Sequence, residues 1–237
     1  MKTVAVVLSG GTGTRMGVDL PKQYLELAGK PIIVHTLEQM ERCEVVDGVI
    51  VTAALEWEAE IVRWKEEFAL NKLLSVAPAG LDRQLSIRNG LMAAERFMDR
   101  DERSGVIIQD AARPLTSVAL LSRLVNELKS ASAVMPALPI TDTTYTSRDG
   151  QWVDGLLDRS TLFAGQAPEA FRFWPYLELY RDTPEEDLSS MSGSCQLPYS
   201  CGWQVKIIPG EPENVKITYT KDLKTCERLL RECEDML

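Results

Sequence analysis

Short runs of apolar residues alternate along this chain with longer stretches of helical periodicity. The runs lack the inside–outside alternation of a half-exposed strand, which predicts strands that are buried on both faces. Helices joining such strands indicate an α/β fold: a Rossmann-like, mostly parallel sheet with helices on both faces. The predicted strands cover residues 4–8, 48–52, 72–76, 105–109 and 133–138, and the predicted helices cover residues 31–43, 57–68, 82–98 and 117–129.

The second half of the chain is less regular. Residues 143–155, TTYTSRDGQWVDG, predict a hairpin with Asp149 and Gly150 at its turn. A hairpin that projects from an α/β domain commonly serves as a lid or a dimer arm. No repeat or linker divides the chain, so a single domain over residues 1–237 is expected. The remaining expected elements are a helix near 169–180, a long loop of turn formers to residue 202, strands at 204–208 and 215–219, and a helix from about Lys221 capped by Thr220.

The bulk charge changes this picture by excluding some partners. A formal net charge of −9 argues against a nucleic acid or an anionic membrane recognised through overall charge. A small anionic substrate stays compatible with it, because a few focused cations can bind such a ligand locally. No window approaches the roughly 18 uncharged apolar residues of a membrane span, and the chain opens directly on a strand pattern with no signal peptide.

Cysteine and histidine content narrows the chemistry further. The cysteines are odd in number and widely spaced, and we recognise no secretion signal in the sequence. This predicts reduced thiols in a cytoplasmic protein, although Cys195 and Cys201 could form a pair. The single histidine, His35, leaves no zinc-ligand pattern and argues against a histidine-based hydrolase. We interpret it as a packing or surface residue. The cysteines are Cys43, Cys195, Cys201, Cys226 and Cys233.

A glycine-rich loop follows the first predicted strand, in the stretch VAVVLSGGTGTRMGVDLPKQYL from residue 4 to residue 25. Such a loop permits close approach of backbone N–H groups to phosphate oxygens. A Walker A loop would need Gly-Lys and then Ser or Thr where Arg15 and Met16 stand, and a dinucleotide fingerprint would need glycine at Met16. Both familiar interpretations fail at a required position. The glycines are Gly10, Gly11, Gly13 and Gly17.

Two cations accompany this loop. Arg15 lies near its end and Lys22 follows seven residues later. Attack on the α-phosphate of a nucleotide builds negative charge on the non-bridging oxygens and on departing pyrophosphate, which two such cations can stabilise. The alternative is a glycine-rich turn with two solvated cations, and the loop alone does not decide between them.

Later segments supply further chemistry. Asp110 follows a strand in GVIIQDAARP and can hold Mg²⁺, which usually takes one or two carboxylates plus substrate phosphates; alternatively it caps the next turn. Arg113 comes shortly after it, and Lys216 stands in the apolar segment NVKIT, where a lysine can also simply point outward. Together with Arg15 and Lys22, these residues would form a cation-rich site around one metal ion.

Seven segments in order resemble the cytidylyltransferases that make CDP-linked alcohols from CTP. The likeness spans nearly the whole chain and covers the 2-C-methyl-D-erythritol 4-phosphate and the ribitol-5-phosphate cytidylyltransferases. It implies a Rossmann-like nucleotidyltransferase domain whose extended arm, here residues 140–161, crosses a homodimer interface. The segments are LSGGTGTRMG, LPKQYLELAGKPI, DRQLSIRNGL, DAARP, DT, GQAPEAF and NVKIT.

The resemblance also implies roles for individual residues. Arg15 and Lys22 would bind the triphosphate of CTP and stabilise charge on the α-phosphate, and Asp110 would bind Mg²⁺. The backbone of Ser9, Gly10, Gly11, Thr12 and Gly13 would hold the base and phosphates, with Gly80 and Ser86 also contacting the nucleotide. Arg113, Thr143, Arg159 and Lys216 would hold a polyol phosphate or orient its phosphate, with Lys216 counted among the catalytic cations.

The implied mechanism is one in-line displacement of pyrophosphate from CTP by a phosphate that is already anionic and needs no general base. Departures from the methylerythritol pattern stand at Ala167-Pro168-Glu169, where a Thr-Pro-Gln is usual, and at Ser192-Gly193-Ser194, where Thr-Asp-Asp/Glu is usual. GGTGTRMG looks closer to the ribitol enzymes, whereas DAARP and LDRSTLF look closer to the methylerythritol enzymes. We favour 2-C-methyl-D-erythritol 4-phosphate, with ribitol 5-phosphate or another polyol phosphate as the alternative. A sugar-phosphate nucleotidyltransferase with another nucleotide and a nucleotide-binding paralogue without turnover stay open.

Overall fold

The computed structural model describes residues 1–11 and 20–234, with side chains to residue 232, and it is built around a mixed sheet. The strand order is β10-β7-β11-β6-β1-β4-β5, and β12, outside this order, pairs parallel with β7. β1, β4, β5 and β6 are mutually parallel, whereas β11 enters antiparallel between β6 and β7. The strands of this sheet are β1 (Thr3–Leu8), β4 (Gly48–Ala53), β5 (Leu73–Pro78), β6 (Gly105–Asp110), β7 (Ala133–Pro139), β10 (Phe163–Gly165), β11 (Glu169–Arg172) and β12 (Val205–Pro209).

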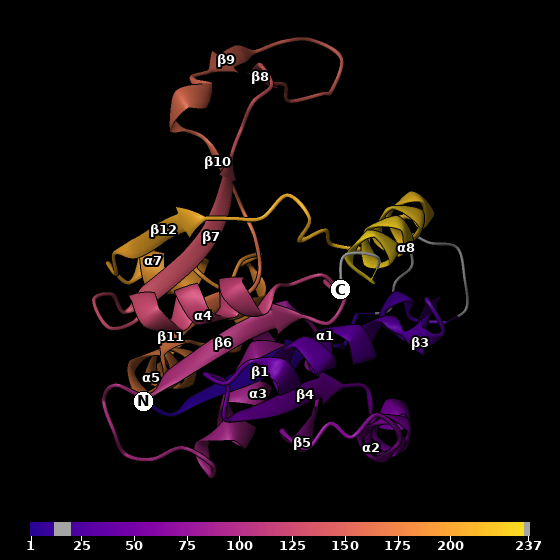
Figure 1. Ribbon diagram of the computed structural model, residues 1–237. Helices are drawn as coiled ribbons and strands as arrows, with labels where there is room; N and C mark the ends of the chain where they lie inside the picture. Colours follow the sequence, from indigo (N-terminus) through magenta and orange to yellow (C-terminus); the bar gives the residue numbers. More distant parts are fainter. Residues whose placement is uncertain (12–19, 235–237) are drawn as a thin grey trace.

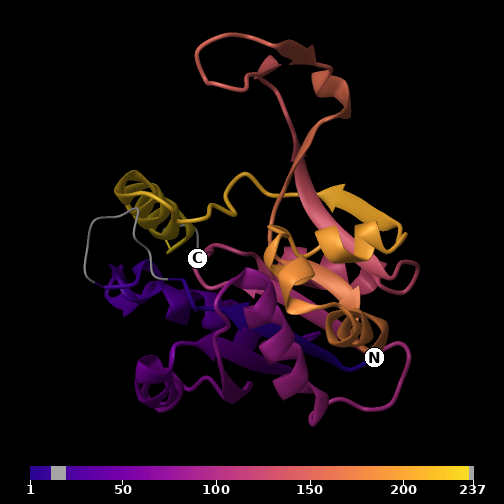
Figure 2. The ribbon, with the colours of Figure 1, turned by 180° about the vertical axis from the view of Figure 1, so that it is seen from behind.

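Helices cover both faces of the sheet (Figures 1 and 2). Successive residues of β1 divide between two cores: Ala5 and Val7 pack with α1, α2 and α4, whereas Val4 and Val6 pack with α3 and α5. This explains why the strand is apolar throughout. The helices are α1 (Ile32–Arg42), α2 (Glu58–Glu67), α3 (Arg83–Glu95), α4 (Val118–Glu127), α5 (Phe173–Asp182), α6 (Glu185–Ser189), α7 (Gln196–Ser200) and α8 (Thr220–Glu234); shorter elements are η2 (Lys22–Tyr24), η3 (Leu55–Trp57), β2 (Glu26–Leu27) and β3 (Lys30–Pro31).

Helix α3 lies unusually close to the central strand. A Cβ added to Gly90 would come within 2.3 Å of Val6 Cγ1, so only glycine permits this approach. Asp82 caps the helix by accepting the N–H of Leu85 at 2.9 Å. The first turn of α3 is thereby fixed beside the carboxyl ends of β1 and β6, which is where open α/β sheets bind ligands.

The α/β fold predicted from the apolar runs is confirmed, and the strands and helices of the first half lie within a few residues of their predicted bounds. Two predictions were wrong. Residues 169–172 form strand β11 instead of the start of a helix, and residues 215–219 form an extended segment outside any sheet. In the latter, Ile217 is buried but its N–H donates to Ala112 O at 2.9 Å, in a loop. The predicted loop before residue 202 contains the short helices α6 and α7.

The predicted hairpin is present and projects from the ends of β7 and β10, away from the rest of the molecule (Figure 1). It consists of β8 (Thr144–Thr146) and β9 (Gly155–Leu157), paired antiparallel, with η4 (Arg159–Thr161) on the return. Gly150 adopts φ +71° at the turn, and Asp149 Oδ1 accepts the N–H groups of Gln151 and Trp152. We call residues 140–161 the arm.

Candidate active site

The carboxyl ends of β1 and β6 open into a cavity of about 350 Å³. Leu8 and Asp110 are register partners at these ends, so the glycine loop and the aspartate emerge side by side. The cavity brings together Gly10, Gly11, Lys22, Gly80, Ser86, Asp110 and Lys216, all predicted from sequence, with Gln23, Asp82 and Arg83 among its other lining residues. Residues from five separate parts of the chain thus meet at one place.

Hydrogen bonds from η2 fix the start of the glycine loop. Gln23 donates both amide hydrogens, to Ser9 O at 2.7 Å and to Gly11 O at 2.8 Å. The Ser9 hydroxyl donates to the Tyr24 hydroxyl at 2.8 Å, and the Tyr24 ring stacks on Trp57 with 4.0 Å between centroids. The side chain of Ser9 is therefore buried in this network, its N–H donates to Thr52 O at 2.8 Å, and Ser9 is not among the residues that line the cavity.

The opposite wall is formed where β5 leads into α3. The Gly80 N–H donates to Ser86 Oγ at 3.0 Å, and that hydroxyl donates to Asp82 O at 2.8 Å. A Cβ at Gly80 would come within 2.3 Å of Leu85 Cβ, and one at Gly10 within 2.5 Å of Ala79 Cβ. Both glycines are consequently required by close packing, in addition to any role with a ligand.

Asp110 is the centre of the charged groups. Its Oδ2 lies 2.7 Å from Lys216 Nζ and 3.8 Å from Arg113 Nε, and its Oδ1 accepts from Arg83 Nη2 at 3.3 Å. Burial by itself favours the neutral acid, yet the adjacent charges of Arg83, Lys216 and Arg113 hold the pKa of Asp110 well below its ordinary value. Asp110 is therefore an anion surrounded by cations.

Buried Asn214 holds Arg113 and the segment that carries Lys216 in place. Its Oδ1 accepts from the Thr116 hydroxyl at 3.0 Å, its Nδ2 donates to Ala167 O at 2.8 Å, and its O accepts from Arg113 Nη1 at 2.6 Å. These bonds anchor the extended segment that carries Lys216. Arg113 Nε is buried without a hydrogen-bond partner among the described residues, so a donor is left for an anion.

A second cavity, of about 280 Å³, shares Arg83, Asp110 and Lys216 with the first. We call the first the nucleotide cavity and the second the acceptor cavity, after the roles that we propose for them below. Glu169 lines the acceptor cavity, 3.7 Å from Arg83. Burial raises the pKa of Glu169, and the Arg83 charge offsets this only in part. The remaining lining residues are Arg113, Met135, Gly165, Gln166, Ala167, Ser192, Gly193, Cys195 and Gln196.

The donor set at Asp110 restricts how a metal can bind. Among the described residues no group of three or more His, Cys, Asp or Glu side chains is placed to hold a metal ion. Asp110 offers one carboxylate, already paired with Lys216 and Arg83. This fits Mg²⁺ that takes most of its oxygens from substrate phosphates and water, and it does not fit a cage made of protein alone.

For three predicted site residues the structure gives no position, and two others lie on the arm. Thr12, Gly13 and Arg15 are outside the described residues. Thr143 and Arg159 lie on the arm, which projects away from the carboxyl end of β6, and Arg159 Nη1 donates to Thr141 O at 2.6 Å. His35 is buried in α1 and bonded to Leu27 O at 2.7 Å, as a packing residue.

Sequence reasoning missed Arg83, Glu169 and Gln23 as site residues. Arg83 was within a recognised segment, and its place directly after the helix cap Asp82 was the available signal. Gln23 adjoins Lys22 and likewise gave a positional hint. Glu169 stood in the stretch Ala167-Pro168-Glu169 that departs from Thr-Pro-Gln, which was the available signal, but β11 was not predicted and nothing placed its side chain in the site.

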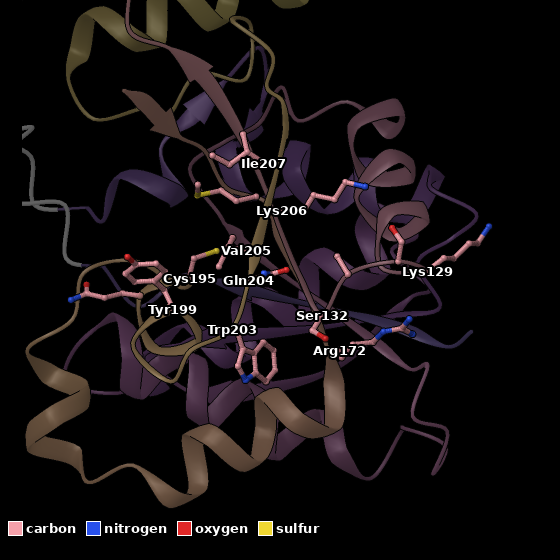
Figure 3. Close-up of a pocket in the computed structure, with 14 residues that line it drawn as sticks. Lys129, Ser132, Arg172, Cys195, Tyr199, Trp203, Gln204, Val205, Lys206 and Ile207 are labelled. Carbon is pink, nitrogen blue, oxygen red and sulfur yellow. The ribbon is translucent and has the colours of Figure 1, made fainter. Parts of the chain in front are cut away.

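A larger cavity, a groove of about 1340 Å³, does not include the Asp110 cluster. Figure 3 shows it bordered by Tyr199 and Cys195 near α7, by Trp203 and by the strand that carries Lys206. It shares Met135, Cys195 and Gln196 with the acceptor cavity but contains none of the predicted site residues. Because the groove brings together neither acids nor buried cations, we do not place the chemistry there.

No helix in the described part of the chain is long and apolar enough to cross a membrane. The cysteines that the structure describes in full, Cys43, Cys195, Cys201 and Cys226, form no disulfides among themselves.

Known proteins resemble this chain over nearly its whole length. The family model described as "IspD: 2-C-methyl-D-erythritol 4-phosphate cytidylyltransferase" matches residues 3–232. The 2-C-methyl-D-erythritol 4-phosphate cytidylyltransferase of Rubrobacter xylanophilus is 36% identical over 230 residues, covering 96% of this chain and 94% of that protein. The ribitol-5-phosphate cytidylyltransferase of Vibrio parahaemolyticus is 32% identical over 216 residues, covering 91% and 90%. The crystal structure of 4-diphosphocytidyl-2C-methyl-D-erythritol synthase from Anaerococcus prevotii superposes with a TM-score of 0.79 at 25% identity, covering 97% of this chain and 96% of that chain.

Proposed function

This chain belongs to the 2-C-methyl-D-erythritol 4-phosphate cytidylyltransferase family of CTP-dependent nucleotidyltransferases, and we propose that it transfers CMP from CTP to a polyol phosphate and releases pyrophosphate. The observation that carries the proposal is the pair of cavities that share Arg83, Asp110 and Lys216. Two phosphate-bearing substrates can meet at this shared boundary. We treat the whole chain as one nucleotidyltransferase domain with the arm as an extension.

The nucleotide cavity would hold CTP. Backbone N–H groups of Gly10 and Gly11, followed by those of Thr12 and Gly13, would face the base and phosphates, with Gly80 and Ser86 on the opposite wall. Ser9, whose N–H donates to Thr52 O at 2.8 Å, would act by positioning the start of the loop. Lys22 lines this cavity and would bind the triphosphate, and Arg15 would do so from the loop. These cations stabilise charge that develops on the α-phosphate and on the leaving pyrophosphate.

The acceptor phosphate would occupy the boundary on the Arg113 side. Lys216, 42% exposed, and Arg113 Nε, which has no hydrogen-bond partner among the described residues, would bind an anion there. The phosphate oxygen then attacks the α-phosphorus in line with the departing pyrophosphate, and one P–O bond forms as another breaks. Catalysis by this arrangement consists of positioning and charge neutralisation.

Mg²⁺ would be held by Asp110 together with substrate phosphates. When bound, the metal neutralises negative charge on the phosphates. Lys216, whose Nζ lies 2.7 Å from Asp110 Oδ2, would contact the acceptor phosphate from the same boundary.

The arm would complete the acceptor site of a second copy of this chain. It exposes an apolar surface, with Trp152 at 75%, Leu156 at 66% and Tyr145 at 58% exposed, which a homodimer would cover. Thr143 and Arg159 would then reach the partner's acceptor cavity, since they lie away from their own. We further propose that the enzyme acts in the cytoplasm, where CTP is available.

We favour 2-C-methyl-D-erythritol 4-phosphate as the acceptor, as named for the Rubrobacter relative. Ribitol 5-phosphate is the second candidate, because the relative named for it is nearly as similar and because Ala167 and Gly193 stand where the methylerythritol pattern has Thr and Asp. The test is pyrophosphate release from CTP and Mg²⁺ with each phosphate separately, and with excess EDTA as the control. Turnover of one of them alone identifies the acceptor.

A nucleotide-binding paralogue without turnover is the alternative of another class. The combination of Lys22, Asp110 and Lys216 at one cavity argues against it, since binding alone does not require all three. Calorimetric binding of CTP in the absence of pyrophosphate release with every polyol phosphate would support that alternative and contradict our proposal.

A further inference from the structure

We propose that Glu169 determines acceptor specificity by accepting hydrogen bonds from the hydroxyl groups of the polyol chain. The proposal rests on the function proposed above and extends it to a residue that phosphate chemistry does not require. It also defines the acceptor class: a phosphate ester whose carbon chain carries hydroxyls close to the phosphate, and not a simple alkyl phosphate.

The fold places Glu169 beside the reacting region. As the first residue of β11 it pairs with Ile108, two residues before Asp110 on β6. Both carboxylates face Arg83, whose Nη2 lies 3.3 Å from Asp110 Oδ1 and 3.7 Å from Glu169 Oε2. Glu169 lines the acceptor cavity and not the nucleotide cavity, so its reach is to the acceptor.

The charges of the cluster make Glu169 unsuited to binding a phosphate. Asp110 already has three cations within 4 Å, namely Arg83, Arg113 and Lys216. Glu169 shares only Arg83 among them and would repel a phosphate dianion. A carboxylate that is only 7% exposed is costly to bury, and next to an anion-binding site it weakens the very charge that attracts substrate. Its favourable contacts are therefore with neutral donors.

The immediate surroundings supply such donors now and leave room for more. The side chains of Ser194 and Cys195 hydrogen-bond to Glu169, and Ser194 Oγ in turn accepts from Arg83 Nη1 at 2.6 Å. These contacts fix the carboxylate without filling its roughly four acceptor positions. A side chain added at nearby Gly193, which also lines this cavity, would meet no atom within 4 Å. Open space beside a positioned acceptor suits a hydroxylated chain.

A purely structural role as the counter-charge of Arg83 makes a different prediction. In that case the loss of Glu169 would disturb Arg83, which lines both cavities, and would weaken CTP and every acceptor alike. If Glu169 contacts hydroxyls, its loss changes the ratio between acceptors and leaves the KM for CTP nearly constant. That ratio separates the two roles.

The experiment compares the wild-type enzyme with Glu169→Leu, Glu169→Asp and the control Glu95→Gln, which removes a half-buried carboxylate partner of Arg181. Leucine is used because glutamine, the usual residue of the methylerythritol pattern here, would keep a hydrogen-bond acceptor. Pyrophosphate release is measured with the better of the two polyol phosphates and with n-butyl phosphate, which lacks hydroxyls, and the binding of both compounds is measured separately by calorimetry, so that turnover is not required. We expect Glu169→Leu to lower kcat/KM for the polyol phosphate by about 10- to 100-fold and to change that for n-butyl phosphate little.

Glu169→Asp keeps the charge for Arg83 but withdraws it by one methylene, and we expect it to lose polyol preference as well. Glu95→Gln should retain the wild-type ratio. The proposal is overturned if Glu169→Leu keeps the polyol preference, whether or not the KM for CTP rises, or if wild-type enzyme binds both compounds equally. Absence of pyrophosphate release, with a binding preference that Glu169→Leu removes, would reject the proposed function and leave this inference standing.

Discussion

The cleft at the carboxyl ends of β1 and β6 and the arm differ in where their hydrogen bonds go. In the cleft, Asp110 meets Arg83 and Lys216 across 27 and 106 positions of sequence, and the charges of Asp110 and Arg83 are largely buried. In the arm, the side-chain hydrogen bonds join residues mostly two to six positions apart, and all are exposed. The cleft is therefore ordered by the whole fold, whereas the arm is ordered by its own turn.

This difference separates two ways of building a site. A cleft whose charges are already in place can stabilise a transition state without reorganising. An arm with exposed apolar side chains acquires its final environment only on contact with another surface. Changes in the cleft should therefore affect stability and activity together, and changes in the arm should affect activity through assembly.

The largest expected effect comes from Asp110→Asn. The substitution leaves buried cations without their shared anion, so we expect a loss of about 3 kcal/mol in the free energy of unfolding and a fall in kcat/KM of about a thousandfold. Urea unfolding and pyrophosphate release measure the two effects. Asp101→Asn, which breaks the exposed pair with Arg103, is the control and should unfold at the wild-type urea concentration. Lowered stability with normal activity would reduce Asp110 to a structural role.

Lys22→Ala and Lys216→Ala should come next. Each removes a cation that lines the nucleotide cavity, and we expect kcat/KM for CTP to fall about a hundredfold. Lys206→Ala serves as the control because Lys206 pairs with Glu127 on the exposed strand β12. Steady-state kinetics at varied CTP concentration measures kcat/KM for each variant. An unchanged rate in Lys22→Ala would mean that the catalytic cations are wrongly assigned.

The comparison also explains what the sequence could predict. Buried parallel strands can be predicted because their apolar runs are uninterrupted. The glycine loop, Asp110 and Lys216 could be predicted because they lie in recognisable segments. The position of Glu169 in the site could not be predicted, because its strand pairs antiparallel between β6 and β7. Local periodicity does not determine which strands pair. The segment 215–219 was misread for the same reason, since buried Ile217 bonds to a loop at Ala112 and not to a strand.

The arm can be tested by complementation. If Arg159 acts in the partner's cleft, then Arg159→Ala and Lys22→Ala damage different parts of each composite site. Mixing equal amounts of the two variants, after unfolding and refolding them together, would give heterodimers with one intact site. We expect about a quarter of wild-type activity from the mixture, because half of the dimers carry one working site of two.

Two controls make that result interpretable. Each variant alone should have little activity, with Arg159→Ala reduced about tenfold or more through the KM for the acceptor. Leu156→Glu, which places a charge on the exposed apolar surface of the arm, should lower the sedimentation coefficient to that of a monomer. A mixture no more active than the sum of its parts would place Arg159 in its own cleft or in none.

The smallest effects give the finest contrast between the two regions. Tyr24→Phe removes the buried hydrogen bond from the Ser9 hydroxyl, and Asp149→Ala removes the exposed bonds to the N–H groups of Gln151 and Trp152. Because Tyr24 belongs to the cooperative core, we expect Tyr24→Phe to lower the free energy of unfolding by about 1 kcal/mol. Asp149→Ala should leave the unfolding midpoint unchanged and accelerate amide hydrogen exchange at Gln151 and Trp152 alone, because the arm opens independently of the sheet. A shift of the global midpoint by Asp149→Ala would show instead that the arm and the sheet unfold as one unit.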